Sequence, residues 1–236
     1  RHEARLTRAE AGPLVDLRLF AVPSFVSGVV FAVVFLCSNT GIPLVLALYY
    51  QDGRGFTALQ SAAGVTAFAL GSVVGAPLAG RFVSRVGRPL LVGAVLLFSA
   101  ATIVLGLLIG LAPLDGDPPA VILRLAAPLF LLGVAGGAIV TPNQTLTLAD
   151  VDPARGGVAG GVVQTAQRLG GAVGQTVLGT SFVLALGSTP RTDTPGVPAP
   201  NLSVFDGAVV VALAVSLVFS LAALAVSVAG VRRARR

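Results

Sequence analysis

Residues 89–111 read PLLVGAVLLFSAATIVLGLLIGL and contain no charged side chain. About 20 mostly apolar residues are enough to cross the hydrocarbon core of a bilayer as one helix. Similar apolar stretches occupy residues 24–50, 59–80, 121–148, 158–187 and 204–231. The sequence therefore predicts an all-α integral membrane protein with six transmembrane helices. A charged cytoplasmic or interfacial lead-in (1–23) would precede this bundle (24–231), and a basic cytoplasmic tail (232–236) would follow it.

The composition supports a membrane protein and excludes several other functions. Hydrophobic residues make up 55% of the 236 residues, and charged residues only 11%, against about 25% charged in soluble domains. Cys37 is the only cysteine and His2 the only histidine, so neither an intrachain disulfide nor a His-based catalytic or zinc centre is expected within the membrane. No Asp or Glu lies in the middle of a predicted span. We expect no enzyme, no metal site and no cofactor.

The arginines predict the orientation of the six spans. Lysine is absent, and the net charge is +6. Six crossings place both termini on one side with the second and fourth loops, and this side carries most of the arginines: Arg1, Arg5, Arg8, Arg18, Arg81, Arg85, Arg88, Arg155, Arg232, Arg233, Arg235 and Arg236. Only Arg54 and Arg191 lie on the opposite side, while Arg124 and Arg168 lie within spans. Because cytoplasmic loops are rich in basic residues, both termini are expected in the cytoplasm.

Two further expectations follow from this orientation. The protein would be a multi-pass protein of the plasma membrane, in contact with the lipid bilayer. Tyr49 and Tyr50 would fall at the outer membrane interface, where amphipathic rings are favoured. The arginines separate apolar stretches and do not form one basic face, so no nucleic-acid partner is expected.

The spans repeat a pattern of three. The first and fourth contain polar residues and a proline, Pro43 and Pro142, well inside the apolar stretch. The second and fifth are rich in glycine, whereas the third and sixth are apolar through their middles and are expected to face lipid. Three helices per repeat give the two copies opposite topology. The pattern predicts two inverted three-helix repeats, as within one half of a secondary transporter.

Polar side chains deep in the spans are candidate cavity residues. At about 100° per residue, Gln164, Arg168 and Gln175 share one side of the fifth span, with Gln167 at its edge. Arginine within a membrane costs about 2.5–3.5 kcal/mol on insertion scales, so Arg168 favours a wet cavity wall with an anionic partner; snorkelling to the cytoplasm is the alternative. Amides and hydroxyls of the first and fourth spans form a second set, for which helix–helix hydrogen bonds are the alternative: Asn39, Thr40, Asn143 and Gln144.

Glycines spaced along the second, fourth and fifth spans predict close helix packing. Small residues four apart let two helix backbones approach each other. The expected packing positions are Gly71 with Gly75, Gly133 with Gly137, and Gly170 with Gly171 and Gly174.

Four segments resemble a known transporter family. The segment GRFVSRVGRPLL (80–91) resembles the cytoplasmic loop signature of the major facilitator superfamily, with Gly80, Arg85, Gly87 and Arg88 at matching positions and Ser84 in place of an aspartate. The run GGVVQTAQRLGGAVG (160–174) is similar to a segment of fourteen-helix drug:proton antiporters of the EmrB/QacA type. PLVDLRLF (13–20) and LYYQ (48–51) resemble the start and end of that family's ninth helix.

The resemblance implies the last six of fourteen helices of an antiporter that exports drugs or lipophilic and cationic compounds by alternating access. The proton gradient would supply the energy, and the N-terminal helices of the same full-length protein, with their proton-carrying acidic residues, would be missing from this chain. The absence of a starting methionine agrees with such a piece. The first and fourth helices would line the central cavity, and Arg85, Arg88 and the loop glycines would form a cytoplasmic hinge.

Two alternatives stay open from the sequence. A dedicated exporter of one endogenous metabolite or antibiotic would share the small-molecule substrate and the mechanism. A non-transporting structural membrane subunit would need neither.

Overall fold

Over the described residues, the predicted all-α fold is confirmed, with six helices long and apolar enough to span a membrane. The computed structural model describes residues 17–111, 114, 116–187 and 202–234. The first span, Pro23–Gly53, combines α2 (Pro23–Asn39), α3 (Gly41–Leu48) and the π-helical turn η2 (Tyr49–Gly53). The other five are α4 (Ala58–Val86), α5 (Arg88–Leu111), α6 (Pro118–Leu148), α7 (Gly156–Leu186) and α8 (Leu202–Ala234), with short 3-10 turns at η1 (Leu17–Ala21) and η3 (Pro153–Arg155). The lead-in up to residue 16, Arg191 and residues 235–236 lie outside the described residues.

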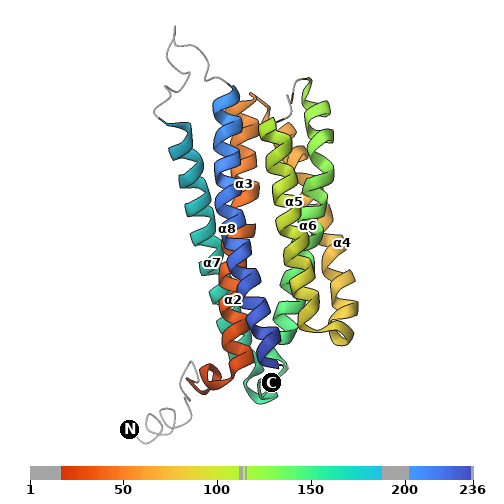
Figure 1. Ribbon diagram of the computed structural model, residues 1–236, viewed down its shortest axis with the longest axis vertical. Coiled ribbons are helices and arrows are strands. Elements are labelled where there is room, and N and C mark those ends of the chain that lie inside the picture. Colours follow the sequence, from red (N-terminus) through yellow and green to blue (C-terminus); the bar gives the residue numbers. More distant parts are fainter. Residues whose placement is uncertain (1–16, 112–113, 115, 188–201, 235–236) are drawn as a thin grey trace, which may run out of the picture.

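The helices run side by side in one bundle, with α7 and α4 at opposite edges (Figure 1). α4 packs on α6, and α2 packs on α7; α5 packs on α6, and α8 packs on α2. Exchanging the first span with the fourth, the second with the fifth and the third with the sixth converts each of these pairs into its counterpart. This is the packing pattern of two inverted three-helix repeats. Below, the end that holds η1 and the last turn of α8 is called the terminal end, and the opposite end the far end (Figure 1).

Glycines bring the second and fourth spans into backbone contact. A Cβ added at Gly71 would overlap the Phe130 carbonyl oxygen of α6, and one at Gly75 would overlap that of Val134. Gly133 and Gly137 of α6 lie equally close to the backbone of α4. The counterpart interface between α7 and α2 is packed in the same way. Gly170 lies against the backbone of Val33, and Gly174 lies against that of Cys37. Close glycine packing therefore recurs in both repeats.

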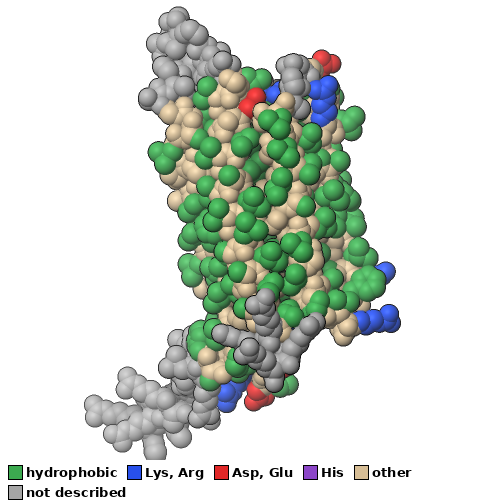
Figure 2. All heavy atoms as spheres, viewed as in Figure 1, with side chains coloured by type: hydrophobic (Ala, Val, Ile, Leu, Met, Phe, Trp, Pro, Cys, Tyr) green, Lys and Arg blue, Asp and Glu red, His purple; other side chains and the backbone are tan. Residues whose placement is uncertain are grey.

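The third and sixth spans are lipid-facing on one side only. On the buried side, the hydroxyls of Ser99 on α5 and Ser220 on α8 lie 2.9 Å apart, and those of Ser38 on α2 and Ser216 on α8 lie 2.8 Å apart. The opposite side exposes large apolar residues: Leu96, Leu97, Ile103, Val104, Leu107, Leu111, Val211, Val218 and Leu221. Figure 2 shows this face as hydrophobic between two ends that carry the charged side chains. The serine pairs join one side of each helix to its neighbours, and the open apolar side is the one that suits contact with lipid.

Candidate functional site

The first span is interrupted at Thr40, between α2 and α3. Pro43 has no amide hydrogen, so the carbonyl of Asn39 loses its usual helical partner. The Thr40 hydroxyl lies 2.8 Å from the Leu36 carbonyl oxygen and 3.0 Å from that of Gly171 on α7. Thr40 therefore joins the interrupted helix to the fifth span.

Asn39 lies between α2 and α6. Its Oδ1 is 3.0 Å from the position that a Cβ would take at Gly136, so this glycine makes room for the amide. The Oδ1 atom is buried and has no hydrogen-bond partner within the described ranges. Buried polar atoms are nearly always hydrogen-bonded, to protein groups or to ordered water. Among the candidate cavity residues, Asn39 therefore offers a buried acceptor for a water or a ligand N–H.

Asn143 connects the same two spans nearer the terminal end. Its side chain is 3% exposed, and its Nδ2 donates to the Gly28 carbonyl oxygen at 3.2 Å. The Thr147 hydroxyl donates to the Asn143 carbonyl oxygen at 2.6 Å and lies against Gly28. The sequence left two roles open for Asn143, contact with substrate or a hydrogen bond between helices. The bond to Gly28 is of the second kind. Gln144, the next residue, is half-buried.

The candidates of the fifth span lie on a different surface. Gln164, Arg168 and Gln175 are exposed on α7, whereas Gln167 is half-buried and its Nε2 has no partner in the described part of the chain. No ion pair of Arg168 is found among the described residues. The structure thus places Asn39 and Asn143 at the contact between α2 and α6. The candidate side chains of α7 lie instead on the outer surface of the bundle.

The loop that resembles the family signature ends α4 and starts α5. Gly87 has φ +65°, a left-handed conformation that favours glycine, and its N–H donates to the Val83 carbonyl oxygen at 2.8 Å. Arg88 then reaches across Gly230 of α8 to the Ser27 hydroxyl of α2, with Nη1–Oγ and Nη2–Oγ distances of 3.4 and 3.5 Å. Arg88 therefore links three helices. The remaining motif residues are exposed on α4: Gly80, Ser84 and Arg85.

A hydrogen-bonded cluster at the far end is absent from the sequence prediction. The Tyr49 hydroxyl donates to Asp206 Oδ1 at 2.6 Å and accepts from Arg54 Nε at 2.8 Å. Arg54 Nη1 donates to the Leu114 carbonyl oxygen at 2.6 Å. The cluster joins the end of the first span to the start of the sixth and to the loop before the fourth. The sequence gives little sign of this cluster. Tyr49 and Arg54 follow an apolar stretch closely, and Asp206 lies near the start of another span.

The two tyrosines expected at the outer membrane interface, Tyr49 and Tyr50, lie at the end of the first span with their side chains inside the bundle. Both side chains are 0% exposed. Tyr50 stacks on Phe56 with ring centroids 5.5 Å apart, and Gly64 leaves room for its ring. Partners inside the bundle therefore hold both rings at the end of the span.

Six membrane-spanning helices, paired as two inverted three-helix units and carrying polar groups in the first, fourth and fifth, are the architecture of one half of a secondary transporter. The family model of the Major Facilitator Superfamily matches residues 2–175, and the chain belongs to this superfamily. It is a multi-pass membrane protein.

Relatives with transport functions match most of this chain. It is 33% identical over 188 residues to the "Probable actinorhodin transporter" of Streptomyces coelicolor, covering 79% of this chain and 32% of the relative. It is 31% identical over 201 residues to the "Drug efflux pump JefA" of Mycobacterium tuberculosis (85% and 37% covered). It is also 31% identical over 177 residues to the "Tetracenomycin C resistance and export protein" of Streptomyces glaucescens (74% and 31%). The chain spans about a third of the length of these relatives.

Proposed function

We propose that the chain is the C-terminal six-helix part of a fourteen-span drug:proton antiporter of the EmrB/QacA type. It would lie in the plasma membrane with the termini of this chain in the cytoplasm. One observation carries the proposal: a chain with six described helices long and apolar enough to span a membrane matches drug and antibiotic exporters over 74–85% of its residues, yet covers only about a third of their length. The rest of such a protein has room for the other helices.

The packing suits a bundle that moves as one body. Glycines hold α4 against α6 and α7 against α2 by backbone contact, so sliding within either pair would separate closely fitted surfaces. Arg88 ties the loop between α4 and α5 to Ser27 of α2. In alternating access, this bundle would rock against the remaining helices around a site near the membrane middle.

The substrate would meet uncharged groups on this side of the transporter. Asn39 Oδ1 offers a buried acceptor near the middle of the first span. Such an acceptor suits N–H groups of lipophilic or cationic compounds. The exposed Arg168 of α7 would meet an anionic group on the remaining helices or on the substrate. The proton-carrying acids would lie in the remaining helices, because the spans described here hold no mid-membrane Asp or Glu.

The proposed position of this chain at the C-terminal end of a longer transporter is tested by the length and topology of the full protein. Reading the gene upstream of codon 1 and measuring the intact mass of the purified protein are expected to show eight further spans, with Asp or Glu inside at least one. Reporter fusions after Ala234 are expected to report a cytoplasmic position. A mature product of 23.6 kDa, the mass of this chain alone, would contradict the proposal.

Substrate breadth separates the proposal from its nearest alternative. Efflux of several unrelated lipophilic or cationic compounds supports a drug antiporter. Efflux restricted to one compound that the producing cell makes would favour the dedicated exporter.

A further inference from the structure

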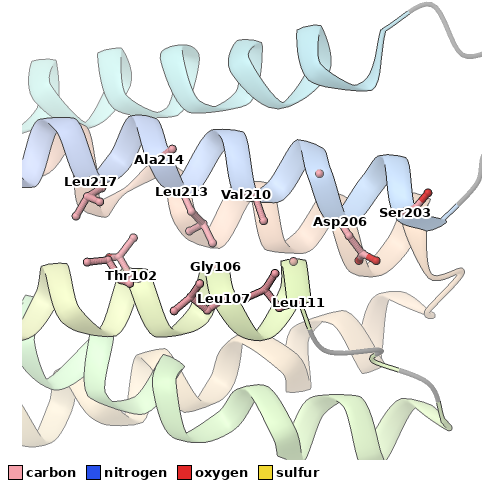
Figure 3. Close-up of a pocket in the computed structure, with 13 residues that line it drawn as sticks. Thr102, Gly106, Leu107, Leu111, Ser203, Asp206, Val210, Leu213, Ala214 and Leu217 are labelled. Carbon is pink, nitrogen blue, oxygen red and sulfur yellow. The ribbon is translucent and has the colours of Figure 1, made fainter.

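A cavity of about 490 Å³ lies between α5 and α8 on the lipid-facing side of the bundle. In Figure 3, Leu107 of α5 and Val210 and Leu213 of α8 point into the space between the two helices. Glycines open it: a Cβ at Gly207 would meet nothing within 4 Å, and one at Gly106 would meet only Leu213 Cδ1, at 3.8 Å. The volume falls within the range of about 300–1,000 Å³ that is typical of small-molecule sites.

Polarity changes along this groove. Ser203 and Asp206 lie at its far end, in the first turns of α8. Deeper in the membrane the lining is apolar apart from Thr102, whose hydroxyl donates to the Phe98 carbonyl oxygen of its own helix at 2.9 Å. The groove continues from Asp206 to Leu217, about 16 Å along the helix axis at about 1.5 Å per residue. It therefore fits a long apolar chain with one polar head at the membrane surface.

The charge at the far end selects the head. Tyr49 holds Asp206 Oδ1 by a 2.6 Å hydrogen bond, and the side chain of Asp206 remains partly exposed where it lines the groove. Among the described residues Asp206 makes no direct ion pair, since Arg54 reaches it only through the shared Tyr49 hydroxyl and turns Nη1 to the Leu114 carbonyl oxygen. A carboxylate at the edge of the bilayer attracts a cation, and a primary ammonium adds N–H donors for charge-assisted hydrogen bonds.

We propose that the groove between α5 and α8 binds an amine-headed phospholipid from the far-end leaflet. One acyl chain would lie along Gly106 and Gly207, and the ammonium group would reach Asp206. The Ser99–Ser220 pair joins the same two helices about one turn beyond Thr102 and Leu217, so the groove ends where the helices come into contact. Its occupancy does not depend on the transport activity proposed above.

Competition between two lipids tests the site in the full-length protein. The protein is placed in nanodiscs with equal amounts of phosphatidylethanolamine and phosphatidylcholine that share the same acyl chains. Both lipids are zwitterionic and carry no net charge, so the arginines at the terminal end are not expected to favour one over the other. Native mass spectrometry then counts the lipids that stay bound. We expect phosphatidylethanolamine to be retained about threefold over phosphatidylcholine, which corresponds to about 0.65 kcal/mol and is typical of an exposed ion pair.

Two variants, each with a matched control, test the binding of the lipid head group and of the acyl chain separately. Asp206→Asn keeps an acceptor for Tyr49 and is expected to abolish the preference, whereas Asp52→Asn, at the same end but outside the groove, keeps it. Gly207→Leu fills the groove and is expected to remove one bound lipid. Gly93→Leu on α5 also enters open space, but outside the groove, and is expected to remove none.

Several results would overturn the lipid site. These are equal retention of both lipids by the unaltered protein, an unchanged preference in Asp206→Asn, or the same number of bound lipids in Gly207→Leu and Gly93→Leu. A dimer that dissociates in Gly207→Leu would assign the groove to a second copy of the protein, which also contradicts the proposal.

Discussion

Replacing Gly75 by leucine is expected to prevent most of the full-length protein from reaching its folded state. A Cβ at this position already overlaps the Val134 carbonyl oxygen, which belongs to the backbone of α6 and can yield only if the whole helix moves. Overpacking of a fitted interior costs about 1–3 kcal/mol, and a backbone clash belongs at or above the upper end of that range. Size-exclusion chromatography of detergent-solubilised protein and its thermal midpoint measure the effect.

Gly93→Leu is the matched control for Gly75→Leu. It makes the same chemical change in the same fold, but a Cβ at Gly93 meets nothing within 4 Å. This variant is expected to elute and unfold like the unaltered protein. Gly174→Leu is expected to behave like Gly75→Leu, because it faces the Cys37 backbone at the counterpart interface of the inverted repeat. If Gly75→Leu matches Gly93→Leu in both measurements, the backbone contact between α4 and α6 is wrong.

Arg168→Ala is expected to lower drug efflux by the full-length protein at least tenfold, about 1.4 kcal/mol of barrier. The guanidinium is exposed on α7, without an ion pair in the described ranges, at a depth where a lone charge is unfavourable. An anionic partner on the remaining helices or on the substrate would therefore lose its counter-charge. Efflux of a fluorescent substrate from loaded cells measures the loss, at protein levels matched by immunoblotting.

Two further variants show whether the charge of Arg168 matters. Arg168→Lys keeps a cation and is expected to restore part of the efflux. Thr165→Ala, one turn away, removes a hydroxyl that donates to the Gly161 carbonyl oxygen of its own helix and is expected to leave efflux unchanged. Full efflux by Arg168→Ala at normal protein levels would rule out a role in transport.

The sequence predicted the helices well because length and apolarity alone decide a membrane span. Residues 89–111 correspond to α5 (Arg88–Leu111). Of the glycines expected to pack, Gly171 faces the Thr40 side chain, and the others lie at backbone contacts: Gly71, Gly75, Gly133, Gly137, Gly170 and Gly174. The packing side of a helix that is apolar all round could not be predicted in this way. Such a helix has no polar face to orient it, so the Ser99–Ser220 pair emerges only when α5 and α8 are placed together.

The polar residues show the same limit. Asn39 and Asn143 look alike in the sequence, yet Asn143 donates to the Gly28 carbonyl while Asn39 Oδ1 has no partner in the described part of the chain. The difference depends on which residue of the other span lies opposite each amide. The Tyr49 and Asp206 contact joins positions from the first and last spans, which no local pattern connects.

Exchange of protons for drug across a sealed membrane is the most direct test of the proposed transporter. The full-length protein is reconstituted in liposomes that contain a pH-sensitive dye, and a proton gradient is imposed. We expect a lipophilic cation to accumulate on the acidic side while protons move the opposite way, and both movements to stop when a protonophore collapses the gradient. Drug movement that continues at the same rate without the gradient, or protons that stay in place while drug moves, would contradict a drug:proton antiporter.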